Sequence, residues 1–212
     1  DEALYSPTKM LMDSLQARGI ETVDLFEPLL AAKKTSPDEL YLRRDTHWTP
    51  AGVDACAPAI VDGIKRILGD DIPGEPISTV RKEVEVLRLG DVGEMTGIPM
   101  REKVWPTQTV KAYQILDSNG VMYYDTLMKR QGVPKEERDA FKETKYQRDS
   151  TSAILWLGDS FSRIFQTDAP ASAGIISQVS HLLDRHMATI VNDGGASTVV
   201  RQQLHRHRHM LN

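Results

Sequence analysis

The stretch Ala153-Ile154-Leu155-Trp156-Leu157-Gly158-Asp159-Ser160-Phe161-Ser162 says most about how this 212-residue chain folds. Its first five residues are all apolar, which is typical of a short central strand buried on both faces. Gly158 permits a sharp turn, and Asp159 also suits one. The apolar residues that follow share one face of a helix: Phe161, Ile164 and Phe165. The stretch therefore predicts a strand, a turn and a helix, with Ser160 at the junction.

Ser160 has two interpretations at such a junction. Its hydroxyl can stand clear of the sheet, where the first N–H groups of the helix can bind a developing oxyanion. Alternatively, Ser160 caps the helix, and the Gly-Asp-Ser triplet by itself favours that role. Ser162 is a competing nucleophile, but it lies further into the helix, where a hydroxyl more often points to solvent. This segment alone leaves the choice open.

A second segment, Arg44-Asp45-Thr46-His47-Trp48-Thr49-Pro50-Ala51-Gly52, supplies what a nucleophilic serine needs. Histidine is the side chain whose pKa suits a base at neutral pH. Asp45 and His47 are two residues apart and face the same way in an extended segment. Asp45 can then hold the imidazole tautomer that frees the other ring nitrogen for Ser160. The alternative is a surface Asp–His pair with Trp48 filling the core, and the segment alone does not decide between them.

A helix over residues 50–68 is expected to anchor this loop. Thr49 suits its N-cap, Pro50 its first position and Gly69 its end. Pro58 lies inside the helix and can kink it. Apolar residues recur on one face: Val53, Ala57, Ile60, Ile64 and Ile67.

The rest of the chain alternates between strand and helix patterns. We expect the following elements: a strand at 20–25, a short helix to about 34, extended structure at 80–89, a β-hairpin at 109–124 around an Asn-Gly turn, a charged connection or short helix at 128–150, a helix at 173–185, a strand at 188–191 and a last helix. This alternation predicts an α/β fold with a mostly parallel sheet and helices on both faces, in three α/β/α layers. We expect one domain over 1–212, with 76–126 as a β-rich insertion. The chain stops within a polar helix, so we expect a domain trimmed at both ends.

Composition excludes several classes of function. The net charge is −4 and the cationic residues are spread along the chain, which does not indicate a nucleic-acid surface or a membrane-binding helix. The longest apolar runs are too short to span a bilayer. Cys56 is the only cysteine, so no intrachain disulfide is possible, and we expect it in the core. Arginines separate the histidines of the run 205–209, so a solvated helix end is expected there. We predict no metal site and no cofactor.

The order of the two segments resembles one family. Asp-x-His-Trp first and Gly-Asp-Ser later is similar to the SGNH-hydrolase-like O-acetyltransferases of alginate biosynthesis, the AlgJ and AlgX type. Ordinary SGNH esterases have the serine block first and an Asp-x-x-His block last. Further stretches resemble the same family: Val23-Asp24-Leu25, Leu40-Tyr41-Leu42-Arg43, Gly90-Asp91 before Met95, and Asn192-Asp193-Gly194-Gly195-Ala196 before Arg201.

The resemblance implies roles for individual residues. Ser160 is implied as nucleophile, His47 as base and Asp45 as the orienting acid. Further residues are implied for the oxyanion and the substrate: Asn192, Gly194, Gly195, Trp48 and Arg201. On local sequence alone, 192–195 is an ordinary turn.

The implied activity is transfer of acetyl groups to hydroxyls of an extracellular, alginate-like polysaccharide in the periplasm, through an acetyl-serine. The implied partners are the polysaccharide and an acetyl donor delivered by a membrane-bound protein. Two alternatives stay open: a carbohydrate acetylesterase with the same triad, and a non-catalytic polysaccharide-binding module.

Overall fold

The structure is a computed structural model that describes residues 2–99, 101–118, 120, 152–193, 196–206 and 208–211. Its elements follow in chain order: α1 (Glu2–Gln16), α2 (Phe26–Thr35), α3 (Pro50–Leu68), β1 (Thr79–Arg88), α4 (Asp91–Met95), α5 (Arg101–Val104), β2 (Gln108–Asp117), β3 (Leu155–Gly158), α7 (Ser160–Arg163), α8 (Ile175–Leu183), β4 (Ala188–Val191), α9 (Ala196–Arg206) and the 3-10 helix η1 (Arg208–Leu211).

Helix α3 has the bounds that the sequence predicts, because its ends are set by local chemistry. The Thr49 hydroxyl accepts the Gly52 N–H at 3.2 Å, and Pro50 opens the first turn. Gly69 ends the helix at φ +80, a conformation that glycine adopts without strain. On the predicted apolar face, Val53 and Ala57 are buried and Ile60 and Ile64 are partly buried, whereas 65% of the Ile67 surface is exposed.

The described strands form two separate pairs. β3 and β4 are parallel, with Leu155 opposite Ala188 and Gly158 opposite Val191. β1 and β2 are antiparallel over ten residues each, from Thr79–Asp117 to Arg88–Gln108. The expectation of a mostly parallel sheet is therefore not met in the described part of the chain, where one pair is of each kind.

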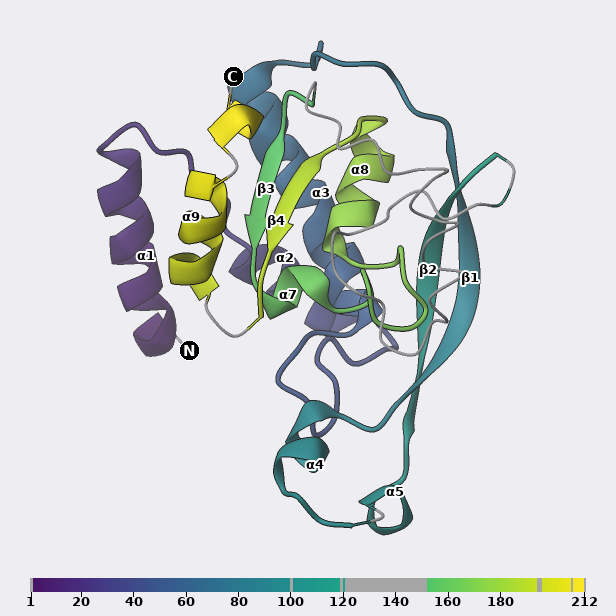
Figure 1. Cartoon of the computed structure of the whole chain (residues 1–212). Coiled ribbons are helices and arrows are strands. Elements are labelled where there is room, and N and C mark those ends of the chain that lie inside the picture. The colour runs from purple at the N-terminus through teal and green to yellow at the C-terminus, as the bar shows by residue number, and fades with distance from the viewer. Residues whose placement is uncertain are drawn as a thin grey trace.

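The elements are layered around the parallel pair (Figure 1). Helix α9 lies on one side of β3 and β4, and α3 and α8 lie on the other. The long β1–β2 ribbon packs beside α3 and α8. One buried apolar cluster joins these parts, and its fully buried members include Val53, Cys56, Ala112, Ile164, Phe165, Ile176 and Val179. The fold is thus α/β, as the alternating pattern predicts.

A small arm projects from the body between the two long strands (Figure 1). It carries α4 and α5, and it begins at Gly90 next to the loop that precedes α3. A Cβ at Gly90 would lie 2.1 Å from the Arg44 carbonyl oxygen, and Gly90 has φ +99. Only glycine therefore fits this junction without displacing the loop.

Several predictions about elements need correction or remain untested. The helix expected to carry Phe161, Ile164 and Phe165 on one face ends at Arg163, and Phe165 has φ +59. The strand expected at 20–25 is irregular, because no described strand lies beside it; Val23 instead packs against α3 at Gly63. The strand expected at 153–157 runs from Leu155 to Gly158 and is only partly buried, because a single strand pairs with it among the described residues. The second strand of the hairpin at 109–124 and the connection at 128–150 lie outside the described residues, and β1 is the described partner of β2.

Candidate functional site

The loop that carries His47 is closed by backbone hydrogen bonds before α3 begins. Leu42 N–H donates to the His47 carbonyl at 3.0 Å, and Thr49 N–H donates to the Leu40 carbonyl at 2.9 Å. Arg44 turns the chain at φ +53. The loop is therefore a tight reversal fixed to the start of a packed helix, which favours a constant position for His47.

Asp45 and His47 form a buried pair. The His47 Nδ1 lies 2.7 Å from Asp45 Oδ1, and the His47 backbone N–H donates to the same oxygen at 3.0 Å. The sequence predicts this contact, but from an extended segment; the structure forms it through a turn in which the aspartate accepts the N–H two residues on. The Asp45 side chain is fully buried and His47 is 7% exposed, so this is not a surface pair.

The other ring nitrogen of His47 is poised for a further partner. Nε2 is buried and has no hydrogen-bond partner among the described residues. An Nδ1–H that donates to Asp45 leaves the Nε2 lone pair available, which is the tautomer a general base needs. The pair therefore has the arrangement of a base with its orienting acid.

Ser160 begins a helix directly after the parallel strand. Asp159 caps α7, because its carboxylate accepts the Phe161 N–H at 3.0 Å. Ser160 is therefore the first residue of the helix and not its cap, which removes the structural role that the triplet alone favours. Ser162 is buried rather than solvent-facing, and its hydroxyl accepts the Trp156 Nε1–H at 3.0 Å.

The two sequence segments meet through Phe161. Its ring centroid lies 5.0 Å from that of His47 and 5.6 Å from that of Trp48. Trp48 Nε1–H donates to the Phe161 backbone carbonyl at 3.2 Å. The histidine loop therefore packs against the residue that follows Ser160, while no hydrogen bond joins His47 Nε2 to Ser160 in the described part of the chain, and the triad stays a prediction.

Asn192 reaches the turn before Ser160 from the neighbouring strand. It follows β4, and its backbone N–H donates to the Gly158 carbonyl at 3.0 Å, which continues the parallel pairing up to the serine turn. Gly194 and Gly195, the other turn residues expected to contact substrate, lie outside the described residues. The oxyanion roles of all three stay predictions.

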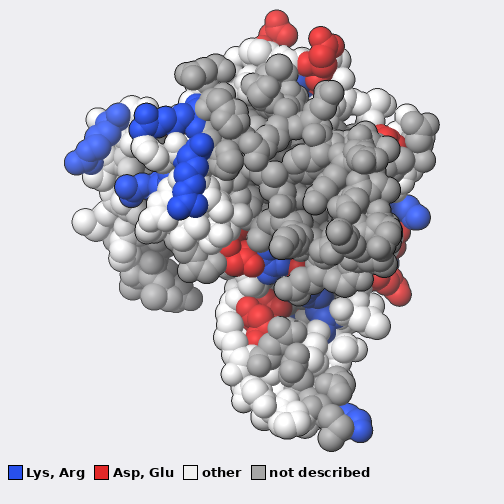
Figure 2. Space-filling view, in the orientation of Figure 1, with Lys and Arg blue, Asp and Glu red and all other residues white. Residues whose placement is uncertain are grey.

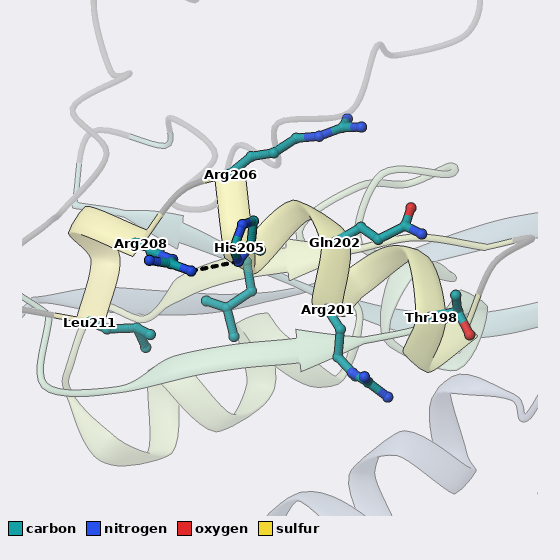
Figure 3. A pocket seen from close by; sticks show the side chains of 8 residues that line it. Thr198, Arg201, Gln202, His205, Arg206, Arg208 and Leu211 are labelled. Carbon is teal, nitrogen blue, oxygen red and sulfur yellow. Dashed lines mark hydrogen bonds between the residues drawn. The ribbon is translucent and has the colours of Figure 1, made fainter.

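Arg201 lines a surface hollow that does not include Asp45, His47 or Ser160. It is exposed on α9 and lines a hollow of about 720 Å³ with residues of η1. In Figure 3 the side chains of Arg201 and Arg206 point away from each other, and Arg208 donates to His205 Nδ1 at 3.0 Å. These guanidinium groups do not converge on one point, so the hollow does not have the form of a site for a single anion.

A chain of charged groups links the histidine loop to the turn after β4. Arg88, at the end of β1, lies 3.8 Å from Asp45 Oδ2 and 3.5 Å from Asp168 Oδ2. Arg163 of α7 pairs with Asp168 and lies 2.5 Å from Asp193. Partial burial lowers the pKa of Arg163, but the two carboxylates outweigh this and raise it overall, so the group stays charged. Charges of both signs gather where the arm joins the body (Figure 2).

Asp91 completes a group of three potential metal ligands with Asp45 and His47, whose ligand atoms lie within 4.8 Å of one another. The sequence did not predict this group, because Asp91 is far away along the chain. Its atoms are already used among themselves: Asp91 accepts two hydrogen bonds from Thr46, and Asp45 holds the His47 ring. A cation bound to Nδ1 would take the place of the Nδ1 proton, and a neutral imidazole would then carry its proton on Nε2. The arrangement therefore fits a hydrogen-bonded Asp–His pair better than a metal site.

Sequence reasoning missed the roles of Arg88, Asp91 and Arg163. In the sequence, Asp91 stands out only as part of a Gly-Asp pair, and no spacing rule connects it to Asp45. Arg163 follows Ser160 by one helical turn, which was the available signal. The geometry of all three depends on how separate elements pack.

Comparison with known proteins confirms the family that the two motifs resemble. Residues 2–198 match the profile of the family described as SGNH hydrolase-like domain, acetyltransferase AlgX. No curated protein matches the sequence significantly. No helix among the described residues is long and apolar enough to cross a membrane.

Two solved structures are similar in fold. One is the O-acetyltransferase domain of Pseudomonas putida AlgJ, with 16% identity and a TM-score of 0.66 over 97% of this chain and 60% of that one. The other is Pseudomonas aeruginosa AlgX, with 16% identity and a TM-score of 0.49 over 87% of this chain and 36% of that one. The chain thus spans about 60% of the length of the AlgJ structure. By its match over residues 2–198, the chain belongs to the SGNH hydrolase-like family of AlgX acetyltransferases.

Proposed function

We propose that this domain is an O-acetyltransferase in which Ser160 carries the acetyl group and His47, held by Asp45, is the general base. One observation carries the proposal: a buried Asp45–His47 pair with a free Nε2 packs against the residue that follows Ser160. This combination supplies a base at the first turn of a helix whose serine is not needed as a cap.

The chemistry follows from the proton positions. Ser160 Oγ attacks the carbonyl carbon of the donor acetyl group while His47 Nε2 takes the hydroxyl proton. The same proton passes to the leaving group of the donor, and an acetyl ester remains on Ser160. A sugar hydroxyl then attacks the ester, gives its proton to Nε2, and leaves as the O-acetyl sugar while Ser160 regains a proton.

Two features support stabilisation of the oxyanion. Ser160 is the first residue of α7, so its N–H belongs to the turn whose amides lack helical acceptors. Asn192 lies beside this turn because its backbone pairs with Gly158. We propose these two residues as donors to the oxyanion.

The acceptor and its setting are proposed from the family. The acceptor is an extracellular, alginate-like polysaccharide, the reaction takes place in the periplasm, and a membrane-bound partner protein delivers the acetyl group. Family membership supports this proposal, and the charged groups around Asp168 give the site mixed polarity suited to a hydroxylated acceptor.

The test is mass spectrometry of the intact protein after exposure to p-nitrophenyl acetate. We expect an acetyl adduct that maps to Ser160 and that is absent from Ser160→Ala. Ser162→Ala is the matched control, because it makes the same change two residues away and should keep the adduct. Loss of the hydroxyl at Ser160 should leave the unfolding midpoint close to that of the parent, since Asp159 provides the cap.

The second stage separates transferase from esterase. Adding oligosaccharides to the acetylated protein should yield O-acetyl sugar faster than free acetate. Acetate as the only product would make the domain an esterase. A wild-type protein that never forms the adduct would overturn acyl-serine chemistry and favour a polysaccharide-binding module.

A further inference from the structure

Asp91 touches every residue of the Asp45-Thr46-His47 segment. Its Oδ1 accepts the Thr46 backbone N–H at 2.9 Å, and its Oδ2 accepts the Thr46 hydroxyl at 2.5 Å. Its own backbone N–H donates to Asp45 Oδ2 at 3.2 Å. Asp91 Oδ2 also lies 3.5 Å from His47 Nδ1. One residue at the start of the arm therefore contacts the acid, the base and the residue between them.

The backbone of Asp91 supplies a hydrogen-bond donor to the buried Asp45 carboxylate. The Asp45 carboxylate is fully buried, and a buried charge is costly unless donors surround it. Its Oδ1 receives two donors from His47, while its Oδ2 receives the Asp91 N–H and lies near Arg88. Without the backbone of Asp91, the second oxygen would lose its closest donor.

The side chain of Asp91 has a separate effect on the loop. Thr46 joins Asp45 to His47, and its backbone N–H and its hydroxyl both donate to the Asp91 carboxylate. Rotation of the Thr46 peptide would carry His47 Nδ1 away from Asp45. A carboxylate that accepts a backbone N–H and a hydroxyl forms charge-assisted bonds, which are the stronger kind.

Asp91 also places a second negative charge beside the imidazole ring. Asp91 Oδ2 lies 3.5 Å from His47 Nδ1, and Asp45 Oδ1 lies 2.7 Å from the same nitrogen. The two carboxylates thus act on one ring nitrogen at unequal distances.

We propose that Asp91 is a positioning residue for catalysis, which holds Thr46 so that Asp45 and His47 keep their geometry and tautomer. This inference rests on the proposed function, since it needs His47 to act as a base. Asp91 does not touch the reacting atoms, and it acts through His47.

The experiment compares Asp91→Asn with Asp70→Asn, which makes the same change at an aspartate whose side chain is 95% exposed. Both are measured for kcat and KM with p-nitrophenyl acetate, together with wild type and Ser160→Ala. We expect Asp91→Asn to lower kcat by about tenfold with little change in KM, comparable to other partners that orient a histidine. Asp70→Asn should match wild type.

A spectroscopic readout separates positioning from a loss of structure. In nitrogen-15 NMR of the His47 ring, wild type should show the Nδ1–H tautomer, and Asp91→Asn should show a mixture of the two tautomers. If Asp91→Asn does not fold, Thr46→Val provides the answer, because it removes the hydroxyl that donates to Asp91 and lies 3.3 Å from His47 Nδ1, and leaves the Thr46 backbone N–H in place. It should shift the tautomer in the same direction and lower kcat by a smaller factor.

Including Ser160→Ala separates a failure of the role proposed for Asp91 from a failure of the proposed function. An active Ser160→Ala would overturn the function whatever Asp91 does. An inactive Ser160→Ala with Asp91→Asn equal to wild type in kcat and tautomer would overturn the role of Asp91 alone. A kcat loss in Asp91→Asn with an unchanged tautomer and a lowered unfolding midpoint would also overturn it, since that would be a structural effect.

Discussion

Replacing Gly90 by alanine should disable the site from the arm side, without changing any candidate catalytic group. The added Cβ would lie 2.1 Å from the Arg44 carbonyl oxygen, 2.7 Å from its carbonyl carbon and 3.0 Å from the Arg43 carbonyl oxygen. Ordinary contact begins at 3.4 Å, so the Arg44 carbonyl must move by about 1.3 Å. All three neighbours are backbone atoms, which cannot rotate away as a side chain end could.

The magnitude follows from two terms. An alanine at φ +99 is strained by about 1–2 kcal/mol, and the overlap adds roughly 1–3 kcal/mol of the kind found for overpacked sites. Arg44 precedes Asp45, so the displacement passes directly into the Asp45–His47 pair. A misplacement of about 1 Å in a catalytic group can lower the rate about 100-fold.

The assay is turnover of p-nitrophenyl acetate together with urea unfolding. Gly97→Ala is the matched control, because Gly97 lies in the same arm at φ +65 with no atom within 4 Å of the added Cβ. Backbone strain alone should lower its free energy of unfolding, by about 1–2 kcal/mol, and its turnover should stay unchanged. If Gly90→Ala had the stability and turnover of Gly97→Ala, the arm would not fix the histidine loop.

Three further changes test other parts of the site and core. Asp45→Asn should lower acetyl turnover by orders of magnitude, because the amide can hold the wrong His47 tautomer; the analogous change costs about 10⁴ in the serine-protease triad. The unfolding midpoint should stay nearly unchanged. Normal turnover would mean that another group orients the ring. Trp48→Phe should lower the free energy of unfolding by about 1–2 kcal/mol in urea, since the Phe161 carbonyl loses its donor; an unchanged midpoint would show that the two segments are held in another way. Burial raises the pKa of the Cys56 thiol from 9.0 to about 11. Below pH 9 the thiol is neutral in both states and its contribution to stability is fully present. As the pH rises from 9 toward 11 the unfolded chain loses the proton first, so the free energy of unfolding falls. Cys56→Ala should remove up to about 3 kcal/mol of the fall in unfolding free energy over that range, and a pH dependence equal to that of wild type would contradict the burial of the thiol.

Local elements were predictable where a short stretch contains its own start and stop signals. Helix α3 runs over the predicted residues because Thr49, Pro50 and Gly69 act within one turn of its ends. The strand at Ala188–Val191 and the turn before Ser160 are local in the same sense. The stretch at 20–25 has an apolar pattern too, but a strand also needs a neighbour, and none lies beside it among the described residues.

The sequence by itself determined the family and the candidate catalytic groups: a match over residues 2–198, an aspartate and a histidine two residues apart, and a serine after an apolar strand. Side-chain types and short spacings are properties of the chain, so these needed no tertiary information. The tertiary structure alone decided that Asp159 rather than Ser160 caps α7, that Ser162 is buried against Trp156, and that Asp91 and Arg88 surround Asp45. Such contacts join residues from strands, loops and helices that are far apart in the chain, and they exist only once the core has fixed where those elements lie.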